Sequence, residues 1–128
     1  MVIDSSALLA IFLWEPEREA LVAAIERDPV RILAAPTLLE TAMVLATRLG
    51  EASLRELDLL IATVRAEIVP FDIDDQRVAR RAFLTYGKGR HPAGLNFGDC
   101  ISYAAAMTRG EPLLFKGNDF VQTDVAVV

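Results

Sequence analysis

The sequence predicts an α/β fold with a central parallel sheet of four to five strands that is covered by helices. Short apolar segments with strand character alternate along the chain with longer segments of helical periodicity. This alternation is typical of parallel strands that are joined by crossover helices. At 128 residues and 14.0 kDa the chain has the size of one domain, and we expect residues 1–128 to share one core.

Each of the first two predicted strands is followed by two helices. The first helix is expected to take Asp4 as its N-cap, and Gly50 is expected to end the helix over residues 37–49. Ser53 and Glu56 have the spacing of a capping box at the next helix. The expected strands are residues 2–3 and 31–35, and the expected helices are residues 5–12, 16–27, 37–49 and 53–65.

The pattern in the second half of the chain predicts two further strands with two helices between them. One helix is expected to begin at Asp74 or Asp75 and the next at Asn96. The expected strands are residues 67–70 and 112–115, with a short fifth at 124–127; the helices are residues 74–86 and 96–108, and the clearest loop is 87–94.

Composition narrows the chemistry that the chain can perform. Cys100 and His91 are the only residues of their kinds, so neither an intrachain disulfide nor a cysteine- or histidine-rich zinc site is expected. A net charge of −5 argues against binding nucleic acid through bulk charge. No apolar run approaches the roughly 18 residues of a membrane span, and no leader segment is evident. A cytoplasmic protein without membrane contact is therefore expected.

Four acidic residues follow or adjoin the ends of the predicted strands. Asp4 follows the first strand, Glu40 the second and Asp119 the fourth, while Asp99 opens the helix over residues 96–108. The crevice of an open parallel sheet lies outside the carboxyl ends of its strands, so these acids are expected to meet there. Oxygen-rich sites suit Mg²⁺ or Mn²⁺.

Each acid also has a structural explanation. Asp4 can cap a helix, Thr37 with Glu40 and Asn96 with Asp99 have capping-box spacing, and Asp119 can belong to a turn. Taken together, the acids favour a site, because buried like charges raise one another's pKa and destabilise the fold unless a cation joins them. Carboxylate clusters that hold divalent ions are typical of enzymes that cleave phosphodiesters.

Four short motifs follow one another along the chain: VIDSSAL at 2–8, PTLLE at 36–40, LNFGDCISYA at 95–104 and LLFKGNDF at 113–120. In order and spacing they closely resemble the PIN-domain ribonuclease toxins of the VapC family. The resemblance implies a three-layer α/β/α sandwich. It also implies a Mg²⁺- or Mn²⁺-dependent endoribonuclease, the toxin of a type II toxin–antitoxin system, whose RNA cleavage a VapB-type antitoxin neutralises.

The resemblance assigns Asp4, Glu40 and Asp99 to the three central acids of the family. Asp119 is the candidate for the fourth catalytic and metal-binding acid. The chain departs from the family pattern here, because many PIN domains place Ser or Thr and then an acid or Asn directly after the last strand. Asn118 or Asp124 is the alternative to Asp119 at this position.

Two further sets of residues complete the predicted site. One set is expected to orient carboxylates or waters around the metal and comprises Ser5, Ser6, Thr37, Asn96 and Asn118. The other is a run of basic residues without an intervening acid, which is either a solvated surface or a contact for the RNA backbone: Arg77, Arg80, Arg81, Lys88 and Arg90.

Other functional classes fit the sequence less well. A haloacid-dehalogenase phosphatase needs a second acid at position 6, where the chain has Ser6, and a receiver domain needs paired acids after the first strand. A non-catalytic PIN-fold binding module would be indicated by loss of a central acid, and all three are present. With 53% hydrophobic residues the chain is also expected to form a homodimer, with Phe12, Leu13 and Trp14 in contact with other chains.

Overall fold

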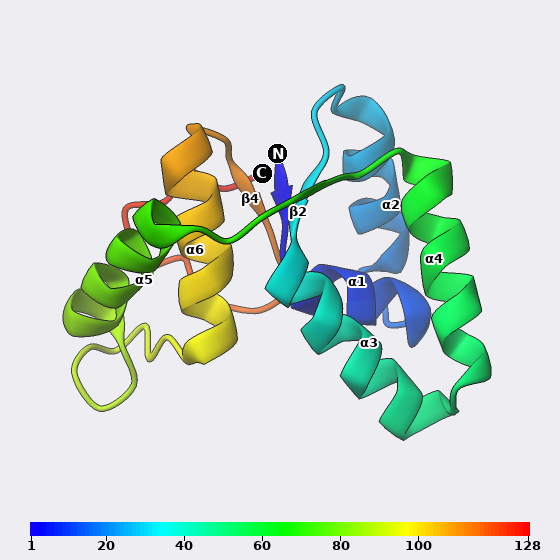
Figure 1. Cartoon of the computed structure of the whole chain (residues 1–128), viewed down its shortest axis with the longest axis horizontal. Helices are drawn as coiled ribbons and strands as arrows, with labels where there is room; N and C mark the ends of the chain where they lie inside the picture. Colours follow the sequence, from blue (N-terminus) through cyan, green and yellow to red (C-terminus); the bar gives the residue numbers. More distant parts are fainter.

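A four-stranded parallel sheet forms the centre of the computed structural model, which describes residues 1–128 (Figure 1). The strand order is β3-β2-β1-β4, so the strand that precedes Asp4, β1, and the strand that precedes Glu40, β2, are neighbours in the middle. Val2 pairs with Ile32 on one side and with Leu113 on the other. The strands are β1 (Val2–Ile3), β2 (Ile32–Ala34), β3 (Glu67–Val69) and β4 (Leu113–Leu114). The predicted α/β/α class is confirmed.

Helices cover both faces of the sheet. Figure 1 shows α5 and α6 on one side and the first four helices on the other. Side chains alternate along a strand, so neighbouring residues of one strand pack on opposite faces of the sheet. Val2 belongs to the core on the side of α5 and α6, and Ile3 belongs to the core on the side of α1 and α2. The helices are α1 (Ser5–Phe12), α2 (Arg18–Arg27), α3 (Ala35–Leu49), α4 (Ala52–Val64), α5 (Ile73–Tyr86) and α6 (Phe97–Arg109).

Three predicted helix starts are wrong, and two possible capping boxes are lost with them. Helix α3 begins at Ala35 rather than at Thr37, because Pro36 fits the first helical turn, where its missing N–H costs nothing. Glu40 is therefore not part of a cap. Helix α4 begins at Ala52, and the Ser53 hydroxyl donates to the Gly50 carbonyl at 2.6 Å instead of capping. Helix α2 begins at Arg18, two residues later than expected.

The predicted fifth strand is reduced to one parallel bridge between Leu113 and Val127. The Leu113 N–H donates to the Ala126 carbonyl at 2.8 Å, and the Val128 N–H donates to the Leu113 carbonyl at 3.2 Å. The sheet accordingly has four strands. None of the helices combines the length and the apolar character that crossing a bilayer requires.

A buried ion pair fastens the start of α5 to the end of α6. Asp72, not Asp74 or Asp75 as predicted, caps α5 and forms a capping box with Asp75. The Asp75 carboxylate is 2% exposed and accepts from Arg109 Nη1 at 2.8 Å and from Thr108 Oγ1 at 2.7 Å. Burial raises the pKa of Asp75, but the bonds from Arg109 and Thr108 outweigh it, so this pKa lies below its ordinary value. The contact fixes α6 against α5.

Replacing Asp75 with Ala should lower the free energy of unfolding by about 3 kcal/mol, because the Arg109 guanidinium would be left partly buried without its carboxylate. Asp74 provides a matched control in the same helix turn. It pairs with Arg77 at 2.8 Å, but both side chains are more than half exposed, so Asp74→Ala should cost under about 1 kcal/mol. Urea unfolding measures both values; equal losses in the two variants would contradict the assigned role of the Asp75 pair.

Candidate metal centre at the strand ends

Asp4 is held rigidly at the end of β1, with one carboxylate oxygen fixed and the other open. Its backbone N–H donates to the Leu114 carbonyl at 2.9 Å, which continues the pairing of β1 with β4. Oδ2 accepts from the Ser6 N–H at 2.9 Å and from the Ser6 hydroxyl at 2.6 Å, as expected for the N-cap of α1. Oδ1 is buried and has no hydrogen-bond partner.

The Ser6 hydroxyl has a fixed direction because it also accepts a hydrogen bond. The Lys116 N–H, in the segment after β4, donates to Ser6 Oγ at 2.9 Å. The hydroxyl proton is then available to Asp4. The segments after β1 and β4 are thereby joined at the carboxyl edge of the sheet, where α1, α3 and α6 also begin (Figure 1).

Glu40 enters the same edge from the second turn of α3, and Gly98 makes room for it. A Cβ at position 98 would lie 2.6 Å from Glu40 Oε1, so a larger residue there would force the Glu40 carboxylate out of its present position. Oε2 is buried without a hydrogen-bond partner. Burial raises the pKa of Glu40, the charge of Asp4 raises it further, and a hydrogen bond from the Ser5 side chain partly opposes the shift.

Asp99 is oriented by the predicted capping box at the start of α6. The Asn96 N–H donates to Asp99 Oδ2 at 2.8 Å, and the Asp99 N–H donates to Asn96 Oδ1 at 3.0 Å. Burial raises the pKa of Asp99 to about 6, helped by the charges of Asp4, Asp119 and Glu40 and opposed by the bond from Asn96. The charges of the other three predicted acids therefore contribute to the raised pKa of Asp99, which indicates that all four acids lie in one region.

The other predicted residues divide into those that touch the acids and those that do not. Ser5, Ser6 and Asn96 contact Glu40, Asp4 and Asp99 respectively. Thr37 is buried and faces Ser102, with 3.4 Å between the hydroxyl oxygens. Asn118 and Asp119 are exposed in the turn after Gly117. The Asp124 carboxylate accepts from the Tyr103 hydroxyl at 2.6 Å, so the alternative fourth acid is engaged away from Asp4.

The donor set fits a hard divalent cation. Asp4 Oδ1 and Glu40 Oε2 are buried carboxylate oxygens without partners, and such atoms are expensive unless something binds them. No three of the histidine, cysteine, aspartate and glutamate side chains are arranged as a finished cage for an ion. Ionised carboxylates repel one another, and a bound cation would offset this repulsion.

Gly98 is the functional residue that sequence reasoning missed. Glycine in a helix destabilises it by roughly 0.5–1 kcal/mol relative to alanine, so a glycine within the first turn of α6 signals a close approach. The partner in that approach, Glu40, lies 58 positions earlier (98 − 40) and cannot be read from local sequence.

The five basic residues do not form one continuous stripe. Arg77 pairs with Asp74 at 2.8 Å. Arg80 and Arg81 leave α5 toward two different hollows, and the Arg90 guanidinium lies 5.3 Å from the centre of the Phe83 ring. Lys88 is exposed in the loop after α5. Arg80, Lys88 and Arg90 remain the members best placed to meet an external anion.

Comparisons with known proteins identify the family of the chain. The PIN-domain family model matches residues 1–126. Ribonuclease VapC of Mycolicibacterium smegmatis is 52% identical over 128 residues, which cover all of this chain and 99% of that protein. Ribonuclease VapC30 of Mycobacterium tuberculosis is 50% identical over 128 residues and is covered to 98% of its length.

Solved structures share the fold at low identity. VapC20 of Mycobacterium tuberculosis, described as a sarcin-ricin loop cleaving toxin, superposes with a TM-score of 0.80 at 15% identity, with 99% of this chain and 97% of that chain covered. A toxin–antitoxin complex from Klebsiella pneumoniae gives a TM-score of 0.74 at 18% identity, with 99% and 95% covered. The family match and the two ribonucleases together show that the chain belongs to the PIN-domain family and, within it, to the VapC ribonucleases.

Proposed function

We propose that this chain is a Mg²⁺- or Mn²⁺-dependent endoribonuclease and the toxin of a type II toxin–antitoxin pair that acts in the cytoplasm. One observation carries the proposal: Asp4 Oδ1 and Glu40 Oε2 are buried without partners beside Asp99, at the carboxyl edge of the sheet. This arrangement destabilises the protein unless a cation is bound. The naming of its relatives as ribonucleases supports RNA as the substrate.

Asp4, Glu40 and Asp99 would hold the cation, with Asp119 at the exposed side. When bound, such an ion supplies a nucleophilic water at neutral pH and stabilises charge on the phosphate. The remaining residues orient the acids: Ser6 fixes Asp4 and leaves Oδ1 free, and Asn96 fixes Asp99. These contacts are of the kind that tunes metal affinity from outside the ligand shell.

The chain's histidine and cysteine are unsuited to catalysis here. His91 Nδ1 accepts from the Ala93 N–H at 3.1 Å, and its ring packs edge-on against Tyr86. Burial raises the pKa of the Cys100 thiol to about 11, so its reactive thiolate is scarce at neutral pH. The phosphatase alternative also loses support, because position 6 holds a serine that binds Asp4 rather than a second acid.

A VapB-type antitoxin and a second copy of the chain are the proposed protein partners. Structural neighbours include toxin–antitoxin complexes. Two large apolar side chains on the side of the first four helices are exposed. Trp14 is 77% exposed, and Leu39, which is 61% exposed, lines an apolar groove between α3 and α4. The predicted contact residues Phe12 and Leu13 are half-buried. An antitoxin that placed an Arg or Lys among the acids would replace the charge of the metal.

Light scattering on the purified chain at tens of micromolar tests the homodimer. The expected mass is twice 14.0 kDa, because large exposed apolar side chains such as Trp14 gain by association. Trp14→Ala reports on whether this surface is used, and a monomer in the wild-type protein would refute the homodimer.

Replacing Asp4 with Asn should reduce Mn²⁺-dependent cleavage of a mixed RNA pool at least about a hundredfold, since even residues that only orient metal ligands contribute roughly 10–100-fold. Glu40→Gln and Asp99→Asn should behave alike. Their metal-free melting temperatures should stay level or rise, because each change relieves repulsion. Asp58→Asn, an exposed acid of α4, is the matched control and should cleave normally. Near-normal cleavage by Asp99→Asn would show that the assignment of the metal site is wrong.

The stabilisation of the protein by Mn²⁺ should increase with pH. The pKa of Asp99 is raised from 3.8 to about 6, so its protonated form stabilises the metal-free fold fully below about pH 3.8, and this contribution is lost as pH rises through about 6. Binding of Mn²⁺ needs the ionised form and stabilises the folded state by mass action. Thermal melts with and without Mn²⁺ should show a small shift at pH 5 and a larger one at pH 8. A shift of the same size at both pH values would contradict this linkage.

A further inference from the structure

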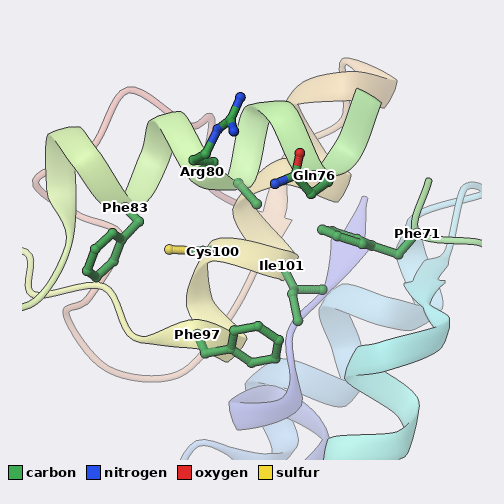
Figure 2. A pocket seen from close by; sticks show the side chains of 8 residues that line it. Phe71, Gln76, Arg80, Phe83, Phe97, Cys100 and Ile101 are labelled. Atoms are coloured by element: carbon green, nitrogen blue, oxygen red, sulfur yellow. The ribbon is translucent and has the colours of Figure 1, made fainter. Parts of the chain in front are cut away.

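A hollow of about 380 Å³ lies between α5 and the start of α6, and nothing in the proposed reaction uses it. The rings of Phe71, Phe83 and Phe97 stand around it, and Gln76 and Arg80 from α5 complete its wall (Figure 2). Its volume falls in the range of roughly 300–1,000 Å³ that is usual for small-molecule sites. This hollow is called the phenylalanine pocket below.

A second hollow, of about 320 Å³, shares lining residues with the phenylalanine pocket and with the acidic site. Phe97 and Ile101 line both hollows, and the wall of the second one includes Glu40. Asp99 belongs to the same helix but, two residues from each of them, lies on a different side of it. The link between the pocket and the acids therefore runs past Glu40.

Positive charge stands on the α5 side of the pocket. Figure 2 shows the Arg80 guanidinium directed outward, while its stem lines the wall. Arg90 lies 5.3 Å from the centre of the Phe83 ring, and Lys88 is exposed in the same loop. This positive charge is a local feature of the surface, since the net charge of the whole chain is −5. A phosphodiester backbone is the polymer that suits cations at the rim of an apolar pocket.

We propose that the phenylalanine pocket binds one unstacked base of a single-stranded RNA, with the neighbouring phosphates on Arg80 and Arg90. This inference rests on the proposed ribonuclease function and names the form of its substrate. Bases of single-stranded RNA stack on aromatic rings, and the Gln76 amide can both donate to and accept from a base edge. The seated base would determine which nucleotide lies beside the cleavage position.

Binding of labelled RNA decamers in EDTA, where cleavage cannot occur, tests the pocket directly. The probes are oligoadenylate, oligouridylate and an abasic ribose-phosphate decamer with the same charge. The wild-type protein should bind the better of the two base-bearing probes about tenfold more tightly than the abasic probe, the scale of one base–aromatic stack. Equal affinity for all three probes would overturn the proposal.

Two variants remove the pocket in opposite ways. Phe83→Ala deletes one ring, and Ala79→Leu keeps every ring but fills the hollow. Both should lose the preference for bases while their affinity for the abasic decamer stays unchanged. Leu84→Ala is the matched control, since Leu84 is an exposed neighbour on α5 that does not line the pocket. A preference that survived in both pocket variants would overturn the proposal.

Two parallel measurements separate this proposal from its alternatives. If Phe83→Ala dissociated a dimer in light scattering and kept the base preference, the pocket would be an interface between copies, and the base assignment would be wrong. Cleavage of a mixed RNA pool with Mn²⁺ tests the enzyme separately. Cleavage without a base preference would overturn the pocket alone, and a base preference without cleavage would overturn the ribonuclease proposal alone.

Discussion

Electrostatic repulsion among Asp4, Glu40 and Asp99 is the constraint that the surrounding structure has to withstand. Burial strengthens this repulsion, because the interior screens charge less than water does. Burial is the main cause of the raised pKa values of Glu40 and Asp99, and the charges of the neighbouring acids raise them further. The fold offsets part of the cost through Ser6 and Asn96, each of which donates to one oxygen of an acid and leaves the carboxylate otherwise free. A bound cation would relieve the remainder.

Helix α6 is the element on which the site's geometry depends most. Its far end is tied to α5 by the Asp75–Arg109 pair. Its near end passes so close to α3 that a Cβ at position 98 would displace the Glu40 carboxylate. The two contacts therefore help to position α6 relative to α5 and α3. A site that positions a phosphate and a neighbouring nucleobase at the same time needs such a rigid supporting helix.

Features set by short-range interactions could be predicted from the sequence, and features set by distant partners could not. The alternation of strands and helices, the Asp4 cap and the Asn96–Asp99 box all depend on residues within a few positions of one another. Glu40 has the spacing of a capping residue, but α3 begins at Ala35, so Glu40 lies beyond its cap. The contact of Thr37 with Ser102 spans 65 positions and leaves no local signal. The phenylalanine pocket likewise needs the packing of α5 against α6, which no local pattern specifies.

The most direct test of this account is anomalous diffraction from crystals grown with Mn²⁺. The two unpartnered oxygens, Asp4 Oδ1 and Glu40 Oε2, identify where the ion should bind. The account predicts an anomalous peak coordinated by both oxygens and facing Asp99. An ordered Mn²⁺ at the exposed acids around the start of α5, Asp72 and Asp74, with none at the strand ends, would contradict it.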